Sequence, residues 1–257
     1  ALVGPTHSER VHLRLLCNMF NASLPPGLGT GEYKGCVYTE CPHPNHPSLE
    51  SLIVRCHQLY DEDSARAPTV IFIKEGEHKV DDERSLIIHY PLKIVGAGRD
   101  KTIIHGGFMI QGTKEEGTQV VLKGMTMKGS SDHGVRAVNG LSFLCTRMTF
   151  TWCDASGVFA SNTKGRLINC VITQCEGSGI DCRENALIEL EGDQTKVDGN
   201  VTSGIGSGLY TYYTSSKIHL LFPLTKESVS TNNHNGQNYG GDGTIQTVEA
   251  FEEEALP

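Results

Sequence analysis

Short apolar runs separated by turn residues occupy most of the chain after Thr69. The runs at 70–73, 86–88 and 120–122 are three or four residues long, and polar or glycine-containing segments follow them. Runs of this length are too short for helices, and their β-branched residues favour strands. The pattern therefore predicts many short strands joined by tight turns, without helices between them.

Four segments of the chain repeat one pattern, and each contains a glycine that anchors the alignment. The anchors are Gly134, Gly157, Gly179 and Gly208, separated by 23, 22 and 29 residues. A period near 22 residues is typical of one coil of a right-handed parallel β-helix. The longer last interval predicts a coil that carries an insertion of about seven residues. A leucine-rich repeat has a similar period, but its leucine and asparagine spacing is absent here.

Aligning the four segments on their anchors produces columns of apolar residues. One position after the anchor stand Val135, Val158, Ile180 and Leu209, and seven positions before it stand Met127, Phe150, Ile172 and Val201. Nine positions before it stand Met125, Met148, Cys170 and Gly199. Side chains alternate across a strand, so these columns should face inward and stack from coil to coil. We expect each anchor glycine to occupy a bend whose backbone dihedrals exclude a Cβ.

The first 67 residues follow a different pattern and are predicted to cap the solenoid. Apolar residues recur at helical spacing over 8–24 and 49–60, with Ser48 as an N-cap, and 27–47 has the composition of a loop. An open coil end exposes strand edges, which a helical segment can cover. An independent partner-binding module is the alternative. The predicted domains are a cap segment over 1–67, a right-handed parallel β-helix over 68–248 and an acidic tail over 249–257.

Charge and cysteine content narrow the choice of partner and compartment. The formal net charge of −8 argues against a nucleic-acid binder, which needs a basic face to replace counterions. No apolar stretch approaches the ~18 residues needed to cross a bilayer. The chain has 9 cysteines, and several stand in the repeats where a small apolar residue is expected. This favours a reducing intracellular or organellar compartment, with secretion as the alternative.

The repeats carry a family resemblance. Each coil ends in glycine followed by an aliphatic residue, as in Gly157-Val158 and Gly179-Ile180. In this the sequence resembles the pectin-lyase-like superfamily, and it is similar to the β-helix repeats of F-box proteins and to right-handed β-helix domain proteins of algae and protists. The resemblance covers roughly residues 69–248. It implies a fold shared by polysaccharide lyases, hydrolases, esterases, epimerases and non-catalytic binding domains, so it leaves the function open.

The candidate binding surface comes from the positions two and four residues after each anchor. These positions should point outward from one sheet on neighbouring coils. Charged and aromatic side chains gathered there could stack on a sugar polymer and hold its carboxylates. The alternative is a solvated sheet face with ion pairs between coils. The predicted ligand-binding residues are Arg136, Phe159, Asp181, Arg183, Tyr210 and Tyr212.

Two acidic residues three positions before their anchors form the candidate catalytic pair. Asp154 and Glu176 should stack on adjacent coils about 5 Å apart. Close carboxylates can share a proton, bind Ca²⁺, or act as acid and nucleophile. Asp181 and Arg183 complete the catalytic candidates, and Asp132 and His133 lie one coil away. The alternative is that these acids are ordinary turn residues; no cofactor is expected except Ca²⁺ in a lyase.

A cysteine- and histidine-rich stretch precedes the second predicted helix. Cys36, Cys41, His43 and His46 fall within eleven residues and are ligands that zinc accepts. Their spacing matches no common zinc finger. The alternatives are a plain loop, or a Cys36–Cys41 disulfide in an oxidising compartment.

The sequence lacks a complete enzyme signature on a repeat fold that offers a long surface. It therefore favours a non-catalytic β-helix domain that binds or scaffolds another macromolecule. The alternative is a carbohydrate-active enzyme, a uronate-polymer lyase or epimerase, using the Arg/Asp/Tyr patch. The expected partners are other proteins or an acidic polysaccharide, and a third reading is a subunit of a larger assembly.

Overall fold

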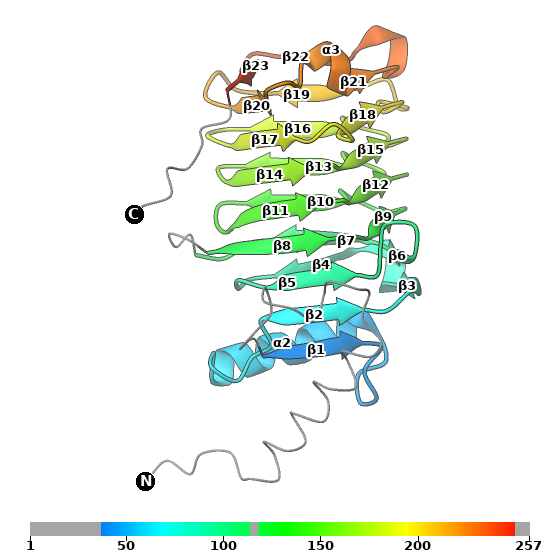
Figure 1. Cartoon of the computed structure of the whole chain (residues 1–257), viewed down its shortest axis with the longest axis vertical. Coiled ribbons are helices and arrows are strands. Elements are labelled where there is room, and N and C mark those ends of the chain that lie inside the picture. The colour runs from blue at the N-terminus through cyan, green and yellow to red at the C-terminus, as the bar shows by residue number, and fades with distance from the viewer. Residues whose placement is uncertain (1–36, 114–117, 250–257) are drawn as a thin grey trace. The chain divides into compact units, whose positions relative to one another are not determined.

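A computed structural model describes residues 37–113 and 118–249 of the chain. Over these residues the chain coils into a parallel β-helix built from three sheets, preceded by a helix (Figure 1). The predicted fold class is confirmed. The helix is α2, Leu49–Glu62. In the part of the chain that the structure describes, every helix is too short or too polar to span a bilayer.

The three sheets run side by side along the coil, and every strand pairs in parallel with its counterpart in the next coil. The long sheet contains β1 (Tyr38–Cys41), β2 (Val70–Ile73), β5 (Lys93–Gly96), β8 (Gln119–Lys123), β11 (Ser142–Thr146), β14 (Lys164–Ile168), β17 (Leu187–Glu191), β20 (Lys217–Leu221) and β23 (Thr244–Val248). The anchor sheet, whose central strands follow the anchor glycines, contains β4 (Ser85–Ile88), β7 (Gly107–Ile110), β10 (Val135–Val138), β13 (Val158–Ser161), β16 (Ile180–Arg183), β19 (Leu209–Thr211) and β22 (Tyr239–Gly241). The third sheet contains β3 (Gly76–Lys79), β6 (Thr102–His105), β9 (Thr126–Lys128), β12 (Thr149–Thr151), β15 (Val171–Thr173), β18 (Lys196–Asp198) and β21 (Ser230–Thr231). Two 3₁₀ turns at Asp81–Glu83 and His234–Gly236 and a short helix α3 (Lys226–Val229) complete the elements.

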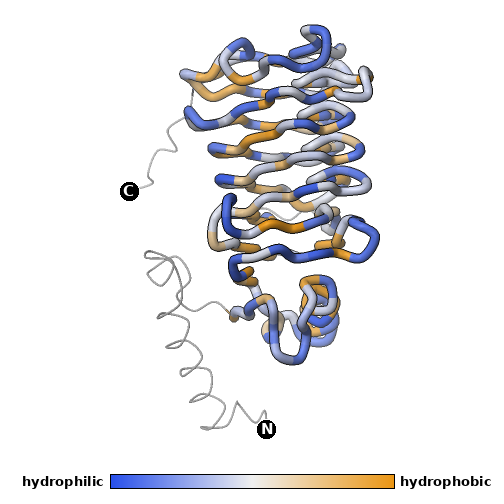
Figure 2. Tube along the Cα trace, turned by 90° about the vertical axis from the view of Figure 1, so that its right-hand side faces the viewer, coloured by the Kyte–Doolittle hydropathy of each residue, from blue (hydrophilic) through white to orange (hydrophobic). Residues whose placement is uncertain are grey.

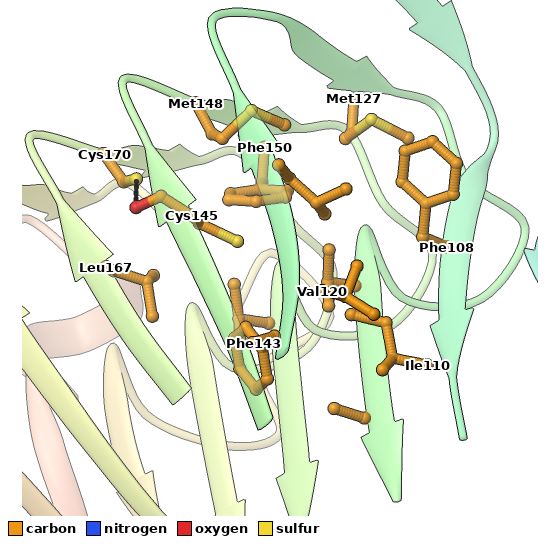
Figure 3. Packing of buried hydrophobic residues seen from close by; sticks show 14 of the residues in the cluster. Phe108, Ile110, Val120, Met127, Phe143, Cys145, Met148, Phe150, Leu167 and Cys170 are labelled. Carbon is orange, nitrogen blue, oxygen red and sulfur yellow. Dashed lines mark hydrogen bonds between the residues drawn. The ribbon is translucent and has the colours of Figure 1, made fainter. Parts of the chain in front are cut away.

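The interior is filled by the columns that the repeat predicts. Val135 pairs with Val158 and Val158 with Ile180, and all three are fully buried. Figure 3 shows side chains from neighbouring coils, among them Met127 and Phe150, pointing into one shared core. Hydrophobic segments recur from coil to coil along the strands, and the turns are mainly hydrophilic (Figure 2). One coil has too little apolar surface to fold alone, so the stacking of coils stabilises the whole.

The predicted columns are wrong in the coil that carries the insertion. Ile172 pairs with Val197 rather than with Val201, and Cys170 therefore lies level with Thr195 rather than with Gly199. Four of the seven extra residues lie between β18 and Gly208, because Val197 stands 11 positions before its anchor whereas Ile172 stands 7 positions before its own, so counting back from the anchor misplaces the strand. Strand pairing decides the register here, because it keeps Val197 in the interior with no exposed surface.

The reason expected for the anchor glycines is also wrong. Gly134, Gly157, Gly179 and Gly208 have no positive φ, so their dihedrals do not exclude a side chain. The restriction is steric. A Cβ at Gly157 would lie 2.3 Å from Cγ2 of Ile172, and one at Gly179 would lie 2.3 Å from Cγ1 of Val197. These contacts come from the next coil, so the glycines are needed where stacked coils approach most closely.

The N-terminal part of the described region confirms one expectation and corrects another. Helix α2 begins at Leu49, where the Ser48 side chain accepts a hydrogen bond from the Ser51 N–H, and it buries Leu49, Leu52, Ile53 and Cys56. The predicted loop is wrong at β1, which pairs in parallel with β2. Its polar sequence hides the strand, since backbone pairing rather than apolar content supports an edge strand. The helix predicted over 8–24 lies outside the described residues, and the domain limits stay predictions.

The cysteines in the described region are free, buried thiols: Cys41, Cys56, Cys145, Cys153, Cys170, Cys175 and Cys182. The Cys170 thiol donates a hydrogen bond of 3.4 Å to the carbonyl oxygen of Cys145 (Figure 3). Burial raises the pKa of Cys170 to about 12, so this thiol stays protonated and inert at neutral pH. The cysteines of the repeats act as small core residues, and the predicted compartment stays a prediction.

A histidine pair ties α2 to the coil above it and should make stability depend on pH. The rings of His57 and His89 lie 4.0 Å apart between centroids, and Nε2 of His57 is sealed from solvent without a hydrogen-bond partner among the described residues. Burial and the neighbouring His89 lower the pKa of His57 from 6.5 to about 4, although the Asp61 carboxylate acts in the opposite direction. The unfolded chain therefore binds this proton more tightly than the folded chain does.

We expect the free energy of unfolding to be lost as the pH falls from 6.5 towards 4, at up to about 1.4 kcal/mol per pH unit from this group. His57→Phe should remove that part of the slope. The measurement is urea denaturation at half-unit pH steps. His234→Phe, at an exposed site, is the control and should leave the slope unchanged. Equal slopes for wild type and His57→Phe would contradict the prediction.

Candidate functional site

The outer face of the anchor sheet brings together the side chains that the sequence predicts for ligand binding. Arg136 pairs with Phe159, Phe159 with Asp181 and Asp181 with Tyr210, so they form one outward column across β10, β13, β16 and β19. A second column begins two residues further on, where Ser161 pairs with Arg183. The Tyr212 N–H donates to the carbonyl oxygen of Cys182, which places this tyrosine next to Arg183.

Asp181 and Arg183 form a two-point ion pair within a single strand. They are two residues apart on β16 and share a face of the sheet. Arg183 Nε donates to Asp181 Oδ1 at 3.0 Å, and Nη2 donates to Oδ2 at 2.9 Å. The Asp181 side chain is 7% exposed and that of Arg183 is 40% exposed. Asp181 lines the groove described below, but its carboxylate is mostly covered by the guanidinium, and its role in ligand binding stays a prediction.

The Arg183 guanidinium is also held between two aromatic rings. Its central carbon lies 5.3 Å from the centroid of Phe159 and 5.0 Å from that of Tyr212. Tyr212 in turn meets Tyr213 edge-on at 4.7 Å, and both rings are about half exposed. Cation–π contacts and the ion pair together fix the orientation of Arg183. The Asp181 carboxylate raises the pKa of Arg183, so it stays charged.

His133 lies in the turn before β10, next to the outer face of the anchor sheet, and lines the groove described below. Its ring packs on Phe159 at 4.7 Å, and its Nδ1 accepts the Ser156 N–H at 3.1 Å. Nε2 lies 3.4 Å from Oδ1 of Asp132. Burial lowers the pKa of His133, although Asp132 and Asp181 act in the opposite direction. The ring is therefore neutral at pH 7, with its proton on Nε2. The sequence suggested His133 only as a companion to the acidic pair.

A groove of about 560 Å³ lies on the anchor sheet, and the site side chains that line it are His133, Asp181, Arg183, Tyr210 and Tyr212. Its other wall is the inserted segment before Gly208, where Ile205 is 79% exposed. Ser203 donates backbone and side-chain hydrogen bonds to the Glu176 carbonyl, and the Ser207 N–H bonds to Ser178 Oγ. The insertion is thereby fastened to the preceding coil. Its presence could be predicted from the repeat spacing, but its role as a groove wall could not.

The predicted acidic pair lies in the turns beside the groove. Asp154 and Glu176 are both exposed and lie on adjacent coils, where the Glu176 N–H donates to the carbonyl of Cys153. Asp154 lines the groove. Within residues 37–113 and 118–249, no group of three or more His, Cys, Asp or Glu side chains is placed to hold a metal ion. The catalytic role of the pair, with or without Ca²⁺, stays a prediction.

The candidate zinc ligands are only partly covered by the structure. Cys36 lies outside the described residues. Cys41 is fully buried in the core, and burial raises the pKa of its thiol to about 11. His43 and His46 stack on each other at 5.6 Å in a turn closed by two backbone hydrogen bonds. The structure supplies no reason to favour zinc over the plain-turn alternative.

Fold and groove together define a parallel β-helix protein with a polar and aromatic groove on one sheet. No family model matches the chain, and no curated protein matches it. Among solved structures, it is similar to a Geobacillus virus E2 chain named ORF18, with a TM-score of 0.45, 15% identity and 69% of this chain covered. The chain spans 40% of the length of that phage chain. It is also similar to the A-module of the Azotobacter vinelandii mannuronan C-5 epimerase AlgE4, with a TM-score of 0.36, 10% identity, and 79% of this chain and 96% of the module covered. At these values neither comparison assigns a family or a function.

Proposed function

We propose that this protein is a non-catalytic β-helix binding domain, and that the groove on its anchor sheet holds a carbohydrate chain. The observation that carries the proposal is the mutual pairing of the groups that could do chemistry there. Both oxygens of Asp181 accept hydrogen bonds from Arg183, and Nδ1 of His133 accepts the Ser156 N–H.

Acid–base catalysis requires a group with a free lone pair or a transferable proton aimed at the substrate. The His133 lone pair is used within the protein, and its Nε2–H faces Asp132. Asp181 is buried beneath its cation. Such an arrangement orients polar groups rigidly without freeing any of them to move a proton, which suits binding better than turnover.

The exposed aromatic rim supports a carbohydrate as the ligand. Tyr212 offers a half-exposed ring next to a fixed guanidinium, and the half-exposed ring of Tyr213 packs edge-on against Tyr212. The apolar faces of sugar rings pack on aromatic rings, and their hydroxyls need fixed polar partners of the kind that line ligand pockets. Membership of the pectin-lyase-like superfamily is part of the same proposal, and rests on the repeat consensus.

A uronate-polymer lyase or epimerase is the second candidate. Asp154 favours it, since its exposed carboxylate lines the groove and is free of any ion pair among the described residues. A lyase would release unsaturated sugar ends, which absorb ultraviolet light. Turnover that disappears in Asp154→Ala would replace the binding proposal with this one.

The test of the binding proposal is calorimetric titration with a panel of oligosaccharides. We expect at least one to bind, and Tyr212→Ala to weaken it by about tenfold or more, a loss of about 1.4 kcal/mol. Tyr239→Ala is the matched control, because both tyrosines are 43% exposed and Tyr239 does not line the groove. An equal effect of the two substitutions, or no binding by any sugar, would overturn the proposal.

A further inference from the structure

We infer that the groove selects a neutral glycan over a uronate polymer. This rests on the proposed function and names the class of sugar that the same site would take. It departs from the acidic polysaccharide that the sequence suggests, and the reason is the balance of charge that folding creates around the groove.

Among the described residues, Arg183 is the one cation that lines the groove, and Asp181 neutralises it through two hydrogen bonds. The neighbouring Arg136 lies 3.8 Å from Oδ2 of Asp132. His133 is neutral at pH 7, as argued above. Each positive charge near the groove thus already has an acidic partner, so no cation remains to meet a carboxylate of the ligand.

The remaining charges near the groove are negative. Asp154 lines it, and Glu176 lies in the adjacent turn. The whole chain carries a formal charge of −8. A uronate would have to displace Asp181 from Arg183, which would leave a buried carboxylate unpaired, or lie beside these acids without a counter-ion. Either arrangement would weaken the binding of a uronate, and neither is required for a neutral sugar.

The same ion pair is well suited to hydroxyl groups. Arg183 uses Nε and Nη2 for Asp181, and no hydrogen bond of the described residues engages its Nη1 amino group. The Asp181 oxygens keep unused lone pairs. Donor and acceptor therefore lie side by side, held by one strand and clamped between Phe159 and Tyr212. A pair of adjacent sugar hydroxyls, each able to donate and accept, complements this arrangement.

The experiment compares matched hexasaccharides by calorimetry: neutral glucan, mannan and galactan fragments against hexamers of mannuronate, guluronate and galacturonate. Each is titrated in EDTA and again in Ca²⁺. We expect a neutral hexamer to bind at least about tenfold tighter than every uronate, in both conditions. Its affinity should change less than about twofold between about 50 and 500 mM salt, since no net charge is exchanged.

A charge variant isolates the cause. Asp154→Asn with Glu176→Gln should raise the affinity for the uronates relative to the affinity for the neutral hexamer, because it removes two negative charges that repel a carboxylate. A uronate that binds as tightly as the neutral sugars, and is lost in Tyr212→Ala, would overturn this inference while the proposed function stands. Absence of binding by all six sugars would overturn both.

Discussion

Replacing Phe143 with alanine is expected to lower the free energy of unfolding by about 3–5 kcal/mol. Phe143 is 1% exposed and lies on β11, where it pairs with Gly165 of the next coil and Val120 of the previous one. A Cβ at Gly165 would lie 2.2 Å from Cζ of the ring, so this glycine provides the space that the ring fills. Backbone pairing on both sides holds the coils apart, so the cavity left by alanine cannot collapse. Chemical denaturation at pH 7 measures the loss.

The contact between the Phe143 ring and Gly165 can be tested separately with a double mutant. Gly165→Ala should itself be destabilising, because the added methyl group meets the ring. In the Phe143→Ala background the same methyl group enters a cavity, so its cost should fall by more than about 0.5 kcal/mol. Leu144→Ala, at the half-buried outward neighbour, is the control and should cost less than Phe143→Ala. Strictly additive effects of the two core changes would refute the proposed contact.

Arg183→Ala is expected to destabilise the protein by about 3 kcal/mol, and Asp181→Ala by about 1 kcal/mol or less. The difference comes from burial. Removing the arginine leaves a carboxylate that is 7% exposed without its partner, whereas removing the aspartate leaves a guanidinium that is 40% exposed to water. An unpaired buried charge costs more than an unpaired solvated one. Denaturation of both variants at pH 7 tests the order. A larger loss of stability in Asp181→Ala than in Arg183→Ala would show that the pair does not act as described.

The coil itself could be predicted because each repeat of the sequence forms one coil of a solenoid. Every coil buries the same positions, so Val135, Val158 and Ile180 mark an inward column that strand pairing reproduces. The alternation of side chains between the two faces of a strand is also a local property of the chain. It correctly placed Arg136 and Phe159 as neighbours on the anchor sheet, because side chains on one strand alternate regardless of what lies beyond it.

The errors arose where a contact depends on another coil. Counting residues could not tell that four of the seven extra residues lie after β18, so it put Val201 in place of Val197. Nor could a single coil show that Gly157 is needed to make room for Ile172 of its neighbour. The edge strand β1 escaped notice because its partner β2, rather than its own polar sequence, supports it.

The amino-acid pattern was thus sufficient for the fold class, for the inward columns of the coils without the insertion, and for the side chains that share the outer face of the anchor sheet. These depend on strand alternation and on a constant repeat, both of which are local properties of the chain. Only the folded structure decided which charges neutralise each other, that Asp181 is buried under Arg183, and that the insertion forms a wall opposite Tyr212. Those outcomes depend on distances and solvent exclusion between coils, and the period of the sequence carries no information about either.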